Sequence, residues 1–235
     1  TASVTNPFES LKFQFPFRKY QRLILSQMDS GKKNQKYHIV APPGSGKTII
    51  GLELIRRFGA PAVVFAPTTT IQKQWQDKVG MFTTDPSQVN HLTSLYPVHL
   101  APINVFTYQL ISTPGEQQDI ARQMAVRQWI EDLLTEGQVT DEATATTRID
   151  TIRQNNPDTY QKEIARRYRR IKQRLLREDQ VDVESFLHPN ARKLIQDLLA
   201  AGVRTVVLDE CHHLLDYWAI VIRHLVRQIK DPHVV

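Results

Sequence analysis

The sequence predicts an α/β fold, a mostly parallel sheet flanked by helices, with an all-α insertion. The first observation is a short apolar run, "YHIV" at residues 37–40, followed by apolar residues at helical spacing over 48–58. The second is the same succession at 63–75, where "VVFA" precedes a helical pattern. The third is "VVL" at 206–208, a continuous apolar run typical of a strand that is buried on both faces of a parallel sheet.

Five segments are expected to form the sheet. We expect strands near residues 37–41, 62–66, 103–107 and 203–208, and one more near 88–92. Helices are expected after the first two segments and after the strand at 203–208, as in a chain that alternates strand and helix.

The connection between the strands expected at 103–107 and 203–208 predicts a second structural unit. A structureless loop of this length is uncommon in a compact domain. Residues 112–202 instead carry four helical patterns, two of which end at Gly137 and Gly202. We therefore divide the chain into an α/β lobe, residues 1–111 and 203–235, and a helical insertion, residues 112–202.

The composition is that of a globular protein without a membrane span. The 235 residues are 41% hydrophobic and 23% charged, and no apolar run reaches the length of about 18 residues that a span requires. The single cysteine, Cys211, excludes an internal disulfide framework and a cysteine-rich zinc site, so we expect an intracellular protein. The net charge of +6 is compatible with a polyanionic partner but does not by itself indicate one.

The stretch "APPGSGKT" at residues 41–48 predicts a site for the phosphates of a nucleotide. Gly44 and Gly46 let the backbone turn tightly, so that amide N–H groups and the start of the next helix face phosphate oxygens. Lys47 would contact the β- and γ-phosphates, and the Thr48 hydroxyl would bind Mg²⁺. The alternative is a chance Gly-Ser turn, which the flanking strand and helix disfavour. The predicted nucleotide contacts are Pro43, Gly44, Ser45, Gly46, Lys47 and Thr48.

Two carboxylates follow the strand expected at 203–208. Asp209 and Glu210 stand at its carboxyl end, where ligands bind in open α/β sheets. Asp209 would hold Mg²⁺ through water, and Glu210 would position and deprotonate the attacking water. The alternative is that these acids only cap the following helix. A phosphate loop and a carboxylate pair each require the other, which favours catalysis.

Together with the phosphate loop, four short motifs that fall in the expected order along the chain resemble those of superfamily 2 helicases and translocases. "DECH" at 209–212 resembles their DExH motif, "FPFRKYQ" at 15–21 resembles the upstream motif, and "VVFAPTTTIQKQW" at 63–75 resembles motif Ia. "INVFTYQ" at 103–109 resembles a segment of the DNA-repair and type III restriction branch. The resemblance covers residues 13–111 and 203–216. It implies a RecA-like first motor lobe that uses ATP and Mg²⁺.

The resemblance also implies roles for single residues. Gln21 would read the adenine edge of ATP, and His212 would couple the nucleotide site to a second lobe. The expected contacts with nucleic acid are Thr68, Thr69, Thr70, Thr107, Tyr108 and Gln109. Thr68 could instead be a helix N-cap, and Tyr108 and Gln109 could be packing at a strand end. Trp75 lies at helical spacing from Ile71 and Val79 and is expected in the core.

The third helix of the insertion is strongly basic. Its apolar stripe of Ile164, Tyr168, Ile171 and Leu175 leaves the arginines on other faces, where Arg166, Arg170 and Arg177 are candidates for phosphate contact. The alternatives are docking on another lobe and a solvated face. Arginines that pair with the insertion's own acids would favour these alternatives.

These observations predict an ATP-binding lobe of a DNA helicase or translocase, with RNA not excluded, which needs a second RecA-like lobe of a longer chain. Two alternatives remain open: a stand-alone nucleotide-dependent switch, and a docking module built on a motor that has lost activity. DNA-independent hydrolysis would favour the first alternative, and a failure to bind ATP would favour the second.

Overall fold

The computed structural model describes residues 5–28, 36–42, 44–111, 114–177, 187, 189–211 and 216–235. Within them, five strands form one sheet in the order β2-β3-β1-β4-β5, and every neighbouring pair is parallel. The predicted α/β fold class is therefore confirmed. The strands are β1 (Ala62–Ala66), β2 (Thr93–Ser94), β3 (Ile103–Thr107), β4 (Thr205–Leu208) and β5 (His233–Val234).

The register of the three central strands fixes where the candidate site lies. Phe65 of β1 is paired with Phe106 of β3 on one side and with Leu208 of β4 on the other. The carboxyl ends of β1, β3 and β4 therefore lie at the same edge of the sheet. Each strand is followed at this edge by one of the motifs that the sequence singled out.

The strand expected at residues 37–41 is wrong. The described part of this segment pairs only through a bridge between Lys36 and Val234, with the Tyr37 N–H donating to the Val234 carbonyl at 2.8 Å. Residues 37–42 otherwise have irregular backbone. Val40, expected in the interior, is 82% exposed.

The strand expected near residues 88–92 is also wrong. A turn at Asp85, whose carboxylate accepts the Ser87 N–H at 3.0 Å, leads into helix α4 (Gln88–Leu92). Pairing starts one residue later, with Thr93 of β2 beside Ile103. The strand expected at 203–208 begins at residue 205, because the Val203 N–H donates to the Leu198 carbonyl and closes the preceding helix.

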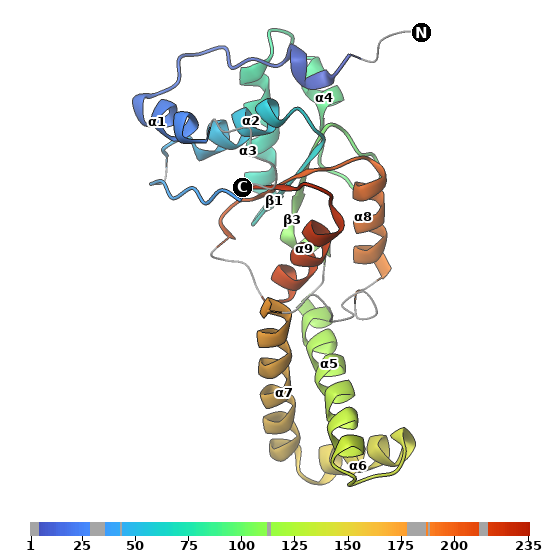
Figure 1. Ribbon diagram of the computed structural model, residues 1–235. Helices are drawn as coiled ribbons and strands as arrows, with labels where there is room; N and C mark the ends of the chain where they lie inside the picture. Colours follow the sequence, from blue (N-terminus) through green and yellow to red (C-terminus); the bar gives the residue numbers. More distant parts are fainter. Residues whose placement is uncertain are drawn as a thin grey trace. The chain divides into compact units, whose positions relative to one another are not determined.

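Helices α2 (Lys47–Phe58) and α3 (Thr69–Val79) pack on one face of the sheet (Figure 1). Ile49, Leu52 and Ile55 of α2 and Trp75 and Val79 of α3 form one apolar cluster with strand residues of a single face. The strand residues are Ala62, Val64, Ile103, Val105 and Val207. Helix α1 (Lys19–Gln27) contacts α2 through a second cluster.

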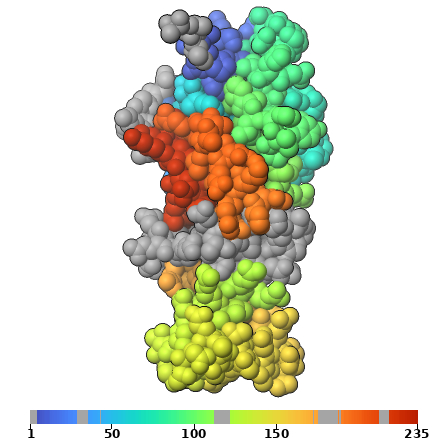
Figure 2. All heavy atoms as spheres, turned by 90° about the vertical axis from the view of Figure 1, so that its right-hand side faces the viewer, coloured from blue at the N-terminus to red at the C-terminus, as the bar shows by residue number. Residues whose placement is uncertain are grey.

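Helices α8 (Pro189–Ala200) and α9 (Asp216–Gln228) complete this part of the chain. They contact each other and the 3-10 helix Tyr108–Ile111 that follows β3. In the space-filling view, α8 (orange) lies beside the red residues of α9 (Figure 2). The α8 segment, which we assigned to the insertion, therefore packs with the α/β lobe. The lobe comprises 1–111 and 189–235, and the second unit comprises 112–188.

The second unit is helical, as predicted. Helices α5 (Pro114–Thr135) and α7 (Pro157–Arg177) run side by side, and α6 (Glu142–Asn155) crosses at one end of the pair (Figure 1). Asp141 caps α6 by accepting the Thr144 N–H at 2.7 Å. The unit has its own apolar core, built from Trp129, Leu133, Val139, Ala145, Ile149 and Tyr160. None of the helices in the described ranges is long and apolar enough to span a membrane.

Candidate functional site

The phosphate loop has the geometry that the glycines predicted. Gly44 and Gly46 have φ angles of 75° and 83°, in the left-handed region that favours glycine. Gly46 is the N-cap of α2, so Lys47 and Thr48 form the first turn of that helix. Its first amide groups therefore face the loop, as an anion site at a helix N-terminus requires. Pro43 lies outside the described residues.

The two carboxylates follow β4 at the same edge of the sheet. The Asp209 N–H donates to the Phe65 carbonyl at 2.9 Å, which continues the pairing of β4 with β1 for one more residue. Glu210 then turns away with a φ of 53°, a conformation that costs a residue with a side chain about 1–2 kcal/mol. This turn brings its Oε1 to 3.3 Å from the Lys47 Nζ. His212 lies outside the described residues.

These groups line one cavity of about 530 Å³, within the size range of small-ligand sites. The structure thus brings together residues that are more than 150 positions apart, such as Lys47 and Glu210. Phe13, Phe15, Pro16 and Ile71 add apolar surface. The predicted site residues that line this cavity are Gln21, Gly44, Ser45, Gly46, Lys47, Thr48, Asp209 and Glu210.

Gln21 lies against the phosphate loop. Its side chain is 3% exposed, its Oε1 accepts the Arg18 N–H at 2.8 Å, and its Nε2 donates to the Gly46 carbonyl at 3.4 Å. A Cβ added at Gly46 would lie 2.6 Å from this Nε2, so any larger residue there would displace the Gln21 amide. The Gln21 amide, which was predicted to bind the adenine edge, thus also stabilises the phosphate loop through the Gly46 carbonyl.

Two buried hydroxyls near the loop lack a hydrogen-bond partner among the described residues. They belong to Tyr20 and to Ser45, the residue between the two loop glycines. A buried hydroxyl without a partner costs free energy, which a ligand with acceptor oxygens would recover. The loop is therefore suited to an anionic ligand. Thr48 and Asp209, which line the same cavity, offer the oxygen donors that Mg²⁺ prefers.

Trp75 is part of this site, a role that the sequence did not indicate. As predicted, its ring is in the core and only 3% exposed. Its indole Nε1–H also donates to the Asp209 Oδ2 at 2.8 Å. Helical spacing predicts the burial of a side chain, but it cannot identify a partner 134 residues away.

Tyr108 is also held at Asp209, and it is not available to nucleic acid. It is fully buried, its hydroxyl donates to the Asp209 carbonyl at 2.9 Å, and its ring stacks on Trp218 of α9. Burial, with the nearby Cys211, Asp209 and Glu210, raises the pKa of Tyr108 well above its usual range. The contact expected with nucleic acid is therefore corrected in favour of the alternative, packing at a strand end.

The other residues expected to contact nucleic acid lie at the surface beside this edge. Thr68, Thr69, Thr70 and Gln109 are exposed and Thr107 is half-buried. The Thr68 Oγ1 accepts the Ile71 N–H at 3.2 Å, so Thr68 is the N-cap of α3. Thr68 is exposed while it caps the helix, and both of the roles considered for it remain compatible with the structure.

The basic helix α7 pairs with acids of its own unit. Arg166 lies 2.7 Å from Glu163, and Arg170 lies 3.6 Å from Asp132. The buried Arg167 also contacts Asp132, at 2.9 Å. This pairing favours docking or a solvated face over phosphate contact by Arg166 and Arg170. The side chain of Arg177, the third candidate, lies outside the described residues.

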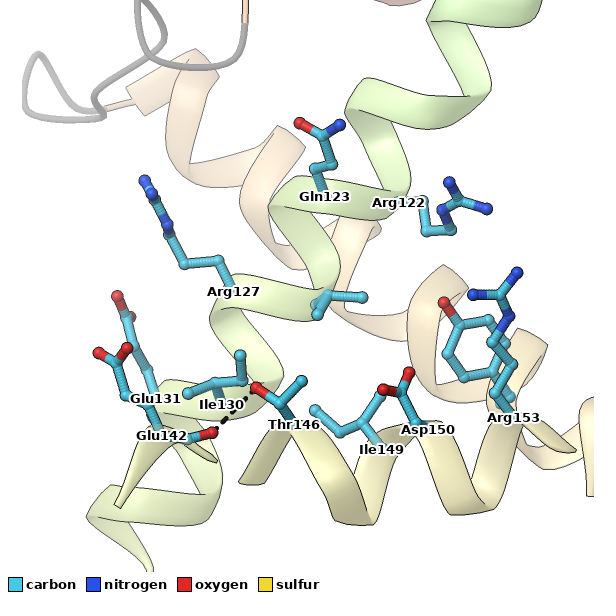
Figure 3. A pocket seen from close by; sticks show the side chains of 12 residues that line it. Arg122, Gln123, Arg127, Ile130, Glu131, Glu142, Thr146, Ile149, Asp150 and Arg153 are labelled. Carbon is cyan, nitrogen blue, oxygen red and sulfur yellow. Dashed lines mark hydrogen bonds between the residues drawn. The ribbon is translucent and has the colours of Figure 1, made fainter. Parts of the chain in front are cut away.

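A second cavity, of about 700 Å³, lies between α5 and α6 of the helical unit (Figure 3). Arg122 and Arg153 project at one end, and Glu131 and Glu142 lie together at the other. None of the predicted site residues lines it. Its mixed charges do not indicate a particular ligand.

Comparison with known proteins identifies a family. Residues 14–232 match the family described as type III restriction enzyme, res subunit. The chain is 30% identical over 92 residues to the "General transcription and DNA repair factor IIH helicase/translocase subunit XPB" of Enterocytozoon bieneusi (strain H348), and the match covers 39% of this chain and 15% of that protein.

Two further relatives also match part of the chain. The protein of the same name from Encephalitozoon cuniculi (strain GB-M1) is 28% identical over 111 residues, 46% of this chain and 16% of that protein. The "Putative helicase 055L" of Frog virus 3 (isolate Goorha) is 35% identical over 69 residues, 29% of this chain and 16% of that protein. The chain thus matches only 15–16% of the length of these relatives.

Proposed function

Since the chain belongs to the family of type III restriction enzyme res subunits, whose ATP-binding domains are of the superfamily 2 helicase type, we propose that it is the first motor lobe of a DNA helicase or translocase. The observation that carries this proposal is the shared cavity. A phosphate loop, an adenine-side glutamine and two strand-end carboxylates line a single cavity of about 530 Å³.

ATP and Mg²⁺ fit the residues of this cavity. The Ser45 hydroxyl, which has no hydrogen-bond partner among the described residues, would bind the phosphates together with the glycine backbone, and Gln21 would lie on the side of the base. Thr48 and Asp209 would hold Mg²⁺, which when bound neutralises phosphate charge as the terminal phosphoryl group leaves. The Lys47 Nζ, which lies 3.3 Å from the Glu210 Oε1, would leave this carboxylate to contact the β- and γ-phosphates.

Glu210 would act on the attacking water. Its carboxylate lines the cavity and lies 3.3 Å from the Lys47 Nζ, beside the phosphate loop. From this position it would orient a water molecule and accept its proton.

The exposed start of α3 supports a surface for DNA. The hydroxyls of Thr68, Thr69 and Thr70 are at the N-terminus of a helix, where phosphate oxygens are bound without regard to base sequence. Gln109, exposed after β3, extends this surface. DNA is proposed as the substrate because relatives are named as helicases and as a DNA repair factor.

Hydrolysis by this chain alone is expected to be slow. Motors of this type take an arginine from a partner lobe to stabilise the transition state, and its loss costs about a thousandfold or more in rate. We therefore expect the chain to bind ATP with little turnover until it is joined to a second RecA-like lobe.

The test is a titration with ATP and a phosphate-release assay on three proteins. The wild-type chain should bind Mg·ATP. Lys47→Ala should bind it at least about tenfold more weakly, because a charged hydrogen-bond donor to the phosphates is lost. Glu210→Gln, the matched control, should retain binding because it removes the base and leaves the lysine. Rapid turnover by the wild-type chain alone would support a stand-alone NTPase instead, and absence of ATP binding would support a docking module.

A further inference from the structure

The Trp75 indole, on the helix that follows β1, contacts both the helix of the phosphate loop and the strand-end Asp209. Trp75 is on α3, and its Nε1–H donates to the Asp209 Oδ2 at 2.8 Å after the end of β4. Its six-membered ring lies on Gly51 of α2, the helix that starts at the phosphate loop. A Cβ added at Gly51 would lie 2.6 Å from the Trp75 Cη2, so a glycine is needed to admit the ring. The ring is therefore confined on one side and hydrogen-bonded on the other.

The chemistry of this donor suits a carboxylate that must bind a cation. The last torsion of an aspartate side chain is broad, so the carboxylate plane is set by its hydrogen bonds. An indole N–H is a donor without charge. It can fix one oxygen without neutralising the carboxylate, whereas a lysine or arginine in the same place would compete with Mg²⁺.

We propose that Trp75 is the positioning residue for Asp209, and that it makes the Mg²⁺ affinity of the nucleotide site depend on the position of α3. This inference rests on the proposed function, since it takes Asp209 as the residue that holds Mg²⁺. The indole occupies Oδ2 and thereby leaves the other oxygen, Oδ1, for the metal or its bound water.

The same helix carries the surface proposed for DNA. Thr68, the N-cap of α3, precedes Trp75 by seven residues, about 10 Å along a helix axis. A displacement of α3 by a ligand at its N-terminus would move the indole relative to Asp209, because a helix is stiff over two turns. Trp75 would thus transmit occupancy of the exposed threonines to the metal site.

The experiment is a Mg²⁺ titration of nucleotide binding by the 235-residue chain, with a fluorescent ATP analogue as probe. Trp75→Phe retains most of the apolar ring and removes the N–H. We expect the Mg²⁺ concentration at half-saturation to rise about tenfold, the lower end of what a hydrogen bond to a charged group contributes. Binding of the probe in EDTA should not change. Phe82→Leu, which changes another aromatic side chain of the same apolar cluster, is the matched control and should leave the Mg²⁺ requirement at the wild-type value.

A second variant and a spectroscopic signal keep the test decisive if Trp75→Phe does not fold. Gly51→Ala retains the N–H but displaces the ring, so it should also raise the Mg²⁺ requirement. In ¹⁵N-indole spectra, the Trp75 signal should shift when Mg²⁺ is added to the nucleotide-bound wild type, while that of Trp129 in the helical unit should not.

The outcomes separate this inference from the proposed function. Wild type that binds no nucleotide would overturn the proposed function and this inference together. Wild type that binds Mg·ATP, with an unchanged Mg²⁺ requirement in Trp75→Phe, would overturn the inference alone. An indole signal of Trp75 that does not respond to Mg²⁺ would do the same.

Discussion

Alanine at the two loop glycines should weaken ATP binding to different extents, because only one of them is crowded. Both glycines have left-handed backbone, with φ of 75° at Gly44 and 83° at Gly46. Alanine in that region costs about 1–2 kcal/mol, equivalent to about tenfold in affinity if the loop leaves its binding conformation to relieve the strain. In the part of the chain that the structure describes, nothing lies within 4 Å of a Cβ added at Gly44, so only the strain of the backbone is expected there.

At Gly46 a second cost is added. The new Cβ would lie 2.6 Å from the Gln21 Nε2, and the Gln21 side chain, 3% exposed, has little room to move. Displacing it breaks the bond from Nε2 to the Gly46 carbonyl, which contributes about 1 kcal/mol, or a further fivefold. We therefore expect ATP affinity to fall about tenfold in Gly44→Ala and about fiftyfold in Gly46→Ala.

The assay is a calorimetric titration with a non-hydrolysable ATP analogue, repeated in a Gln21→Ala background. Without the glutamine, the crowding disappears, so Gly46→Ala should cost only about the tenfold loss that backbone strain produces. Equal affinities of Gly44→Ala and Gly46→Ala, or an undiminished effect of Gly46→Ala when Gln21 is alanine, would refute this explanation.

Three further changes test other parts of the site. Gln21→Ala should narrow the preference for ATP over GTP, since guanine presents its donor and acceptor in reverse; equal discrimination in variant and wild type would leave Gln21 as a support of the loop only. Tyr108→Phe should lower the free energy of unfolding by about 1 kcal/mol in urea, because the Asp209 carbonyl loses its donor; an unchanged midpoint would contradict this. Burial and the nearby Arg204 lower the pKa of His233 below its usual value of 6.5. The folded state therefore disfavours the charged imidazole, so the stability that this residue contributes is present above pH 6.5 and is lost as the pH falls. His233→Phe should flatten this acid dependence between about pH 7.5 and 5.5, and an equally steep loss in the variant would assign it to other groups.

Continuous apolar runs predicted the centre of the sheet well. The strands at 62–66 and 103–107 have the expected bounds. A run such as "VVFA" is apolar on both faces of the strand, so it is stable only in the centre of a sheet that is covered on both sides. The failures are at the edges. Residues 37–41 are as apolar as a strand, but a strand also needs a partner in the right register, which local sequence does not encode.

The residue types of the candidate site could be predicted from their chemistry, but the contacts between those residues could not. Glycines, a lysine and paired acids have few functions in that order, so residues 44–48, Asp209 and Glu210 could be assigned to one site, while the apolar and basic residues that complete the cavity could not. The partners of Asp209 were not, because Trp75 and Tyr108 reach it from other strands and helices. An aromatic side chain at helical or strand spacing indicates burial, and its polar atom becomes informative only when the fold supplies the acceptor.

The most direct test of the proposed function is a structure of the chain with Mg²⁺ and a non-hydrolysable ATP analogue. The triphosphate should lie on the amides of residues 44–48, with the base beside Gln21. The Lys47 Nζ should have left Glu210, from which it is now 3.3 Å distant, and should contact the phosphates. A nucleotide bound elsewhere, or a triphosphate in this cavity with the pair between Lys47 and Glu210 intact, would contradict the account.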